Sequence, residues 1–179
     1  MARFDPDKKV SNLRAREAME RAQLMFREHP LAPKKENPPT TAVWSGGLQC
    51  QLEHPEGHLV VTDMTTVLGG AASGPSPGWL LRAALASCTA TAIAMRAALQ
   101  GIELRGLEVS VNGDVDIRAA VGIEDVSLAM SGIRMTIKIR SENAPEDRLR
   151  EIAQWGATQS TVSATLRERS SVAVEVSVV

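Results

Sequence analysis

Aromatic residues are scarce in this chain of 179 residues: they make up 3% of it, and tyrosine is absent. Proteins that bind single-stranded nucleic acid stack the bases on aromatic side chains, and this sequence offers few. A basic excess is also lacking, because 20 lysines and arginines are balanced by 21 aspartates and glutamates. Such a balance does not favour the neutralisation of phosphates. We therefore expect no nucleic-acid partner.

Cysteine is nearly absent too, with only Cys50 and Cys88. Two cysteines cannot build a disulfide framework, and a domain of this size does not need one. The first nine residues are polar and lack the apolar block of a secretory signal peptide. The longest apolar stretch, residues 79–99, carries Arg82 and Arg96, and each arginine would cost roughly 2.5–3.5 kcal/mol at the centre of a bilayer. These features predict a cytoplasmic protein without a membrane-spanning helix.

What the chain does contain is enough apolar sequence for a core, 44% of its residues. Its N-terminal part predicts an amphipathic helix that is capped by Ser11 and runs to about Glu28. A proline-rich stretch follows at residues 30–39 and favours an extended linker. We therefore expect an N-terminal helix and linker over residues 1–39 and one domain over residues 40–179.

Short β-like runs alternate with turn signals over residues 40–63, which predicts an antiparallel meander. Ser76 and Pro77 then provide a helix cap and a first helical residue. The helix should run to a stop at Gly101. Because it is rich in alanine and apolar on every side, we expect it to be central and buried nearly all round.

Two longer β-like segments, about 104–116 and 126–140, predict a hairpin. Pro145 opens another helix, which Gly156 is expected to close. Ser160 can then cap a short helix that follows directly.

The chain ends on an alternating pattern, residues 172–179, with valines on one face through most of its length. A strand with this pattern is expected to be paired in a sheet. Together these elements predict an α+β fold in which antiparallel sheets surround a long central helix that carries Cys88.

The start of that helix, residues 74–90, reads GPSPGWLLRAALASCTA. It resembles the central motif of the OsmC/Ohr family, the osmotically inducible protein C and organic hydroperoxide resistance-like proteins, in which a small-residue turn leads into a cysteine-bearing helix. Residues 101–109 and the order of the strands support the resemblance, which covers about residues 40–179. The sequence is therefore identified as a divergent member with an N-terminal helical extension.

The resemblance implies an intertwined homodimer with the two central helices packed together. It also implies thiol-dependent reduction of organic hydroperoxides: a thiolate attacks the O–O bond, becomes a sulfenic acid and is resolved by a second cysteine. Cys88 is then the candidate peroxidatic thiol, and a small hydrophobic hydroperoxide is the expected partner. We expect no cofactor and no metal, because His54 and His58 fall in a turn containing proline and glycine.

The chain departs from the family pattern at three positions. Ser160 stands where the resolving cysteine is expected, Gly78 where a glutamate is expected, and Leu48 where an arginine is expected. A hydroxyl cannot form a disulfide, and a thiol without a nearby cation is only a few per cent ionised at neutral pH. Either an external thiol reductant or Cys50, on the strand face of Leu48, would have to resolve oxidised Cys88.

Two functions remain open. The first is an enzyme, a Cys88-dependent peroxidase. The second is a non-catalytic dimeric binding or scaffold protein with an apolar ligand pocket, in which Cys88 serves as a small apolar residue. Trp79 and Trp155 either line such a pocket or fill the core.

Overall fold

The computed structural model describes residues 13–30, 37–168 and 171–178. Its contacts divide the chain into two units: one contains residues up to 23 together with those from 84 onward, and the other contains residues 24–83. The helix α1 (Leu13–Glu28) confirms the predicted N-terminal helix, while its proposed cap at Ser11 lies outside the described residues. The predicted domain boundary after residue 39 stays a prediction.

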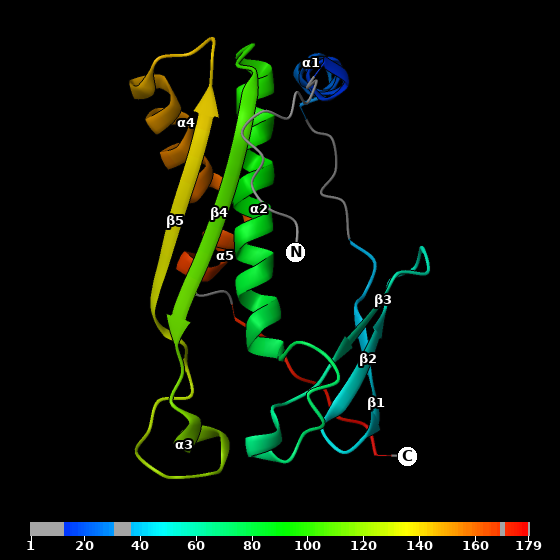
Figure 1. The fold of residues 1–179 in the computed structure, drawn as a ribbon. Helices are drawn as coiled ribbons and strands as arrows, with labels where there is room; N and C mark the ends of the chain where they lie inside the picture. The colour runs from blue at the N-terminus through cyan, green and yellow to red at the C-terminus, as the bar shows by residue number, and fades with distance from the viewer. Residues whose placement is uncertain (1–12, 31–36, 169–170, 179) are drawn as a thin grey trace. The chain divides into compact units, whose positions relative to one another are not determined.

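The second unit contains the predicted meander. Strands β1 (Thr41–Gly46), β2 (Gln49–Glu53) and β3 (Leu59–Thr62) pair antiparallel in the order β1-β2-β3 (Figure 1). The first turn requires glycine, because Gly46 and Gly47 have φ angles of 118° and 56°, which side chains disfavour. The glycines at residues 46 and 47 therefore predicted the turn between β1 and β2 correctly.

Asp63 follows β3 and organises the small-residue loop that leads to the long helix. Its carboxylate accepts hydrogen bonds from the backbone N–H groups of Met64 (2.7 Å), Ala71 (3.0 Å) and Ser73 (3.1 Å), and from the Ser73 hydroxyl (2.8 Å). These bonds, the one from the Ser73 backbone first, hold the pKa of Asp63 below its usual value. Because Asp63 is only 3% exposed, its carboxylate fixes the loop from inside.

Helix α2 (Pro77–Leu99) begins where the sequence predicted, and the backbone N–H of Trp79 donates to the cap hydroxyl of Ser76 at 3.3 Å. Four of its five buried residues recur every four positions and form one stripe, Leu85, Thr89, Ile93 and Ala97, and Ala98 is the fifth. The other side is exposed at Ala84, Ser87, Thr91 and Met95. The prediction of a helix buried nearly all round is therefore wrong for the single chain.

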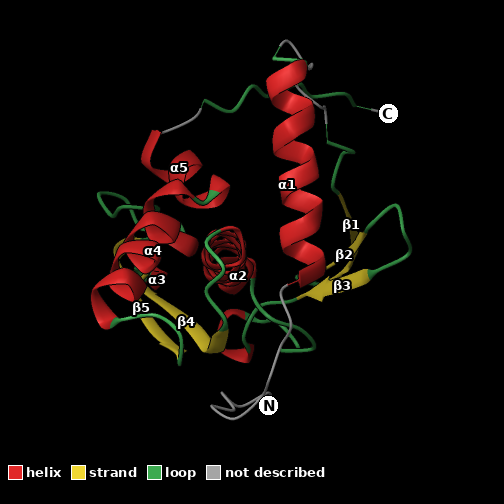
Figure 2. Ribbon diagram, turned by 90° about the horizontal axis from the view of Figure 1, so that it is seen from above, coloured by secondary structure: helices red, strands yellow, loops and turns green. Residues whose placement is uncertain are grey.

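One-sided packing explains this difference. The helices α4 (Glu146–Gln159) and α5 (Thr161–Glu168) and the hairpin of β4 (Leu104–Asp114) and β5 (Ser131–Ser141) gather on one side of α2 when it is viewed along its axis (Figure 2). By length and composition α2 could cross a membrane. The core helix of a folded domain passes the same test, and one stripe of α2 is buried.

The core of the first unit lies between α2, α4 and the hairpin. Apolar residues face each other across the hairpin, which pairs Leu107 with Ile139 and Val109 with Ile137. They pack on a buried cluster: Ile93, Ala97, Ile102, Leu104, Leu149, Ile152 and Ala153. Each fully buried isoleucine contributes about 1.5–3 kcal/mol, so this cluster fixes the hairpin against the helices.

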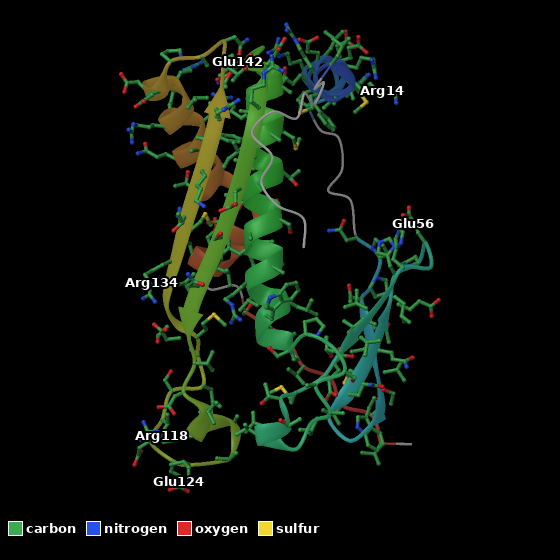
Figure 3. The ribbon with its side chains drawn as sticks, in the orientation of Figure 1. Arg14, Glu56, Arg118, Glu124, Arg134 and Glu142 are labelled. Carbon is green, nitrogen blue, oxygen red and sulfur yellow. The ribbon has the colours of Figure 1, made fainter. Side chains whose placement is uncertain are left out.

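Charged residues cover the exposed surface of the same hairpin. Lys138 Nζ lies 2.8 Å from Glu108 Oε1, and Arg134, labelled in Figure 3, pairs with Asp114 at 3.5 Å. The short helix α3 (Ile117–Ala120) lies in the connection between the two strands. The antiparallel pairing of β4 with β5 confirms the predicted hairpin, although its second strand begins at Ser131 and not at about residue 126.

Gly156 does not end α4, contrary to the prediction, because the helix continues to Gln159. The residue is buried, and a Cβ built on it would lie 2.3 Å from Cγ1 of Ile93. Glycine is needed here because α4 approaches α2 closely, and not because the helix must stop.

The C-terminal prediction is also wrong for the single chain. Residues 171–178 form no strand, and their four valines, at 172, 174, 176 and 178, are 78–95% exposed. The preference of valine for strands reflects packing against a neighbouring strand, and within the described chain no strand pairs with this segment.

Replacing Gly156 by alanine should destabilise the first unit. Overpacking typically costs about 1–3 kcal/mol, more than the roughly 0.5–1 kcal/mol that alanine gains over glycine in a helix. Chemical unfolding measures the difference, with Gln154→Ala on the exposed face of α4 as the control. Equal stability of Gly156→Ala and the wild type would contradict the close approach.

Candidate functional site

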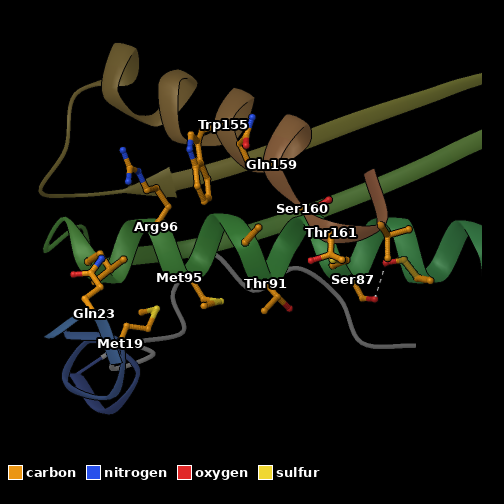
Figure 4. Close-up of a pocket in the computed structure, with 15 residues that line it drawn as sticks. Met19, Gln23, Ser87, Thr91, Met95, Arg96, Trp155, Gln159, Ser160 and Thr161 are labelled. Carbon is orange, nitrogen blue, oxygen red and sulfur yellow. Dashed lines mark hydrogen bonds between the residues drawn. The ribbon is translucent and has the colours of Figure 1, made fainter. Parts of the chain in front are cut away.

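A pocket of about 750 Å³ lies along the exposed side of α2 (Figure 4). Its lining comes from α1, α2, α4 and α5 and belongs entirely to the first unit. Cys88 lines this pocket as a free, partly exposed thiol. The volume falls in the usual range for small-molecule sites. Cys88, the candidate peroxidatic residue, therefore opens onto a space that can hold a ligand.

Ser160 lines the same pocket and is almost completely buried. Its hydroxyl lies 3.3 Å from Thr89 Oγ1, and it accepts a hydrogen bond from the backbone N–H of Ser163 at 3.3 Å. The second bond caps α5 and confirms the predicted capping role. The position where the family pattern predicts a resolving thiol therefore carries a hydroxyl that stabilises the local fold.

Arg96 is the one charged side chain among the described residues that line the pocket. Its guanidinium lies 5.0 Å from the ring centroid of Trp155, a cation–π contact that joins α2 to α4. Arg96 follows Cys88 by eight residues, roughly 12 Å along the helix axis at 1.5 Å per residue. It is therefore not placed to contact the sulfur directly.

Trp79 and Trp155, two of the three tryptophans in the chain, differ in role. Trp155 lines the pocket and is 37% exposed, so the pocket alternative holds for it. Trp79 is 50% exposed near the start of α2 and is not a core residue of the single chain.

The remaining predicted residues belong to the second unit. Cys50 lies on β2, opposite Trp44 and Thr62 in the strand register. Leu48 lies in the turn between β1 and β2, and Gly78 in the first turn of α2. The structure thus brings Cys88 and Ser160 to one pocket, whereas a Cys50–Cys88 disulfide stays a hypothesis.

Metal-ligating residues do not cluster in the part of the chain that the structure describes: it contains no group of three or more histidine, cysteine, aspartate or glutamate side chains able to hold an ion. His54 and His58 lie in the turn between β2 and β3, where the Nδ1 atom of His54 accepts a hydrogen bond from the backbone N–H of Glu56 at 3.1 Å.

Two contributors to the pocket were missed from the sequence, Met19 and Gln23 of α1. They stand four residues apart and so share one face of that helix. The available signal was the amphipathic pattern of residues 11–28, but a pattern does not say which surface its apolar face contacts.

Comparison with known proteins identifies the family. The profile of the OsmC-like protein family matches residues 70–176, which include α2, the hairpin, α4 and α5. The chain therefore belongs to the OsmC-like protein family. No curated protein matches it.

Solved structures share the fold at low sequence identity. An OsmC-like protein from Mycoplasma pneumoniae is 18% identical, with 75% of this chain and 89% of that chain covered and a TM-score of 0.63. An organic hydroperoxide resistance protein from Elizabethkingia anophelis is 15% identical, with 75% of this chain and 91% of that chain covered and a TM-score of 0.57. The organic hydroperoxide resistance protein OsmC from Legionella pneumophila is 18% identical, with 74% of this chain and 92% of that chain covered and a TM-score of 0.52. These likenesses confirm the predicted α+β fold with antiparallel sheets and a central cysteine-bearing helix.

Substituting Thr89 by valine should cost about 1–3 kcal/mol of stability, because the buried Ser160 hydroxyl loses a hydrogen-bonding partner. Thr91→Val is the matched control, since Thr91 is exposed on the same helix and its change should stay within about 0.5 kcal/mol. Urea unfolding of both variants measures the contrast. Equal effects would show that the Thr89–Ser160 contact contributes little.

Proposed function

We propose that the chain is a thiol peroxidase that reduces small hydrophobic organic hydroperoxides through Cys88. The observation that carries the proposal is the free thiol of Cys88, on the central helix of an OsmC-like fold, opening onto a pocket whose walls are mainly apolar. Such walls suit the hydrocarbon part of a hydroperoxide, and the thiol supplies the nucleophile.

The proposed reaction has three steps. The Cys88 thiolate attacks the terminal oxygen of the hydroperoxide, the O–O bond breaks, and the alkoxide takes a proton and leaves as an alcohol. Cys88 is then a sulfenic acid. An external thiol condenses with it to give a mixed disulfide and water, and a second thiol releases Cys88 as a thiol and leaves as part of a disulfide.

A thiol from elsewhere must resolve the sulfenic acid, because Ser160, which shares the pocket, cannot form a disulfide. Its hydroxyl is occupied with Thr89 and with the cap of α5. Cys50 is the remaining protein thiol, and a Cys50–Cys88 disulfide is the second route by which oxidised Cys88 would be resolved.

The names of two structural neighbours agree with this chemistry, since the Elizabethkingia and Legionella proteins are called organic hydroperoxide resistance proteins. At 15% and 18% identity they support the fold alone. The assignment of activity to this chain therefore rests on Cys88 and its pocket.

A specific observation favours the second candidate, a non-catalytic binding or scaffold protein. Arg96 is the one charged residue among the described lining residues, and its guanidinium lies over Trp155. A pocket with so little charge suits an apolar ligand that is bound without reaction at Cys88.

The proposal places the protein in the cytoplasm, because the cytosol supplies thiol reductants. It also includes a homodimer. Within one chain α2 leaves Ala84, Ser87, Thr91 and Met95 exposed, and the valines of residues 171–178 have no strand beside them. A second copy of the chain would cover both. Sedimentation velocity at micromolar concentration should give a dimer, and a monomer at every concentration would contradict this part of the proposal.

Hydroperoxide consumption tests the activity. With cumene hydroperoxide and dithiothreitol, the wild type should exceed the uncatalysed rate and Cys88→Ser should fall to it, because the attacking sulfur is gone. Cys50→Ser should keep the wild-type rate if the external thiol resolves Cys88. Background rates in both the wild type and Cys88→Ser would exclude the peroxidase and leave the binding protein.

Peptide mapping without reductant separates the two routes of resolution. After mild peroxide treatment, a linked Cys50–Cys88 peptide would identify Cys50 as the resolving thiol. A sulfenic-acid adduct on Cys88 without that link would identify the external thiol.

A further inference from the structure

The carboxylate of Asp63 lies at the centre of the loop that joins β3 to α2. One of its oxygens, Oδ2, accepts three hydrogen bonds, from the backbone N–H groups of Ala71 and Ser73 and from the Ser73 hydroxyl. The other, Oδ1, accepts a hydrogen bond from the backbone N–H of Met64. Because four donors converge on one group, the loop forms a concave anion site that the chain fills with its own side chain.

The loop backbone is folded tightly around this carboxylate. A Cβ built on Gly70 would collide with the carbonyl oxygen of Met64 and would lie 2.9 Å from Oδ1 of Asp63, so only glycine fits there. Ala72 has a φ angle of 52°, a left-handed conformation that is unfavourable for a residue with a side chain. Such a conformation persists only where its surroundings impose it, and the residues on both sides of Ala72 donate to Asp63.

Asp63 also connects the meander to the start of α2. Its backbone N–H donates to the carbonyl of Pro75 at 3.3 Å, one residue before the helix cap. The Ser73 hydroxyl, which donates to Asp63, accepts a hydrogen bond from Nε2 of Gln49 at 2.7 Å. Gln49 begins β2, and its Oε1 accepts a hydrogen bond from the Ser45 hydroxyl at 2.8 Å. A chain of hydrogen bonds therefore runs from the end of β1 through Asp63 to the start of α2.

The groups that hold the Asp63 carboxylate are neutral N–H and O–H donors. They favour its ionised form, and they keep its pKa below the usual value of an aspartate. Donors of this kind recognise a carboxylate by its two oxygens and its negative charge, whether or not it is attached to the chain.

We propose that Asp63 is a positioning residue that locks the β1–β3 meander to the start of α2, and that the site around its carboxylate accepts a free small carboxylate, such as formate, when the Asp63 side chain is removed. The meander then has its direction relative to the first turn of α2 set by one buried anion. None of these contacts involves Cys88, so the lock holds or fails independently of peroxidase activity.

Hydrogen–deuterium exchange of the full-length protein, measured by mass spectrometry over residues 64–75, tests the proposal. Asp63→Ala should raise the exchange rate of these residues at least about tenfold, because the loss of one hydrogen bond to a charged group is enough for that factor. Sodium formate should restore slow exchange in Asp63→Ala. Sodium chloride at the same ionic strength should not, because a single spherical ion cannot take the positions of both carboxylate oxygens.

Glu53→Ala is the matched control, because it removes a carboxylate from an exposed position of β2 in the same meander, and it should leave the exchange of residues 64–75 unchanged. Ser73→Ala keeps the Asp63 carboxylate but removes its link to Gln49. Residues 45–49 should therefore exchange faster in Ser73→Ala, and formate should not slow them.

Three results would each overturn the proposal: wild-type exchange of residues 64–75 in Asp63→Ala, recovery in chloride equal to that in formate, or an equal slowing by formate of residues 146–159 in α4. If Asp63→Ala is unfolded in chloride, its circular dichroism should return to that of the wild type in formate, and the absence of that recovery would exclude the carboxylate site. Unchanged exchange of residues 45–49 in Ser73→Ala would exclude the lock.

Discussion

The first unit depends on the burial of one stripe of α2 beneath α4 and the β4–β5 hairpin, with Ile93 packed where Gly156 lacks a side chain. Interiors are packed at close to crystal density, so this contact sets the register of α4 on α2. Two polar contacts follow from that register, Thr89 with Ser160 and Arg96 with Trp155. Cys88 opens beside that stripe, onto a pocket that residues of α1, α2, α4 and α5 line.

The sequence predicted the features that local physics determines. The long helix from Pro77, the meander, the hairpin and the cap at Ser160 all depend on residues close together in the chain, through turn chemistry, capping and periodicity. The family followed from a short motif around Cys88. That Cys88 and Ser160 line one pocket could be expected only through that family, because 72 positions separate them and periodicity does not relate them.

The features that the sequence did not predict depend on distant partners. Gly156 has the same local signature as a helix stop, and only its contact with Ile93 shows that it is a packing residue. Asp63 gives no periodic signal, yet its carboxylate collects N–H groups eight and ten residues further along. The place of α1 beside the pocket was missed for the same reason. An amphipathic pattern identifies the apolar face of a helix but not the surface that this face contacts.

The exposed C-terminal valines have a consequence for solubility. A run of alternating valines with one carboxylate, Glu175, and no proline over residues 172–178 has the composition of segments that add indiscriminately to open β-edges. An exposed segment of this composition can pair with a sheet edge of another molecule whenever it lacks a specific neighbour. We therefore expect these seven residues to govern how readily the protein aggregates.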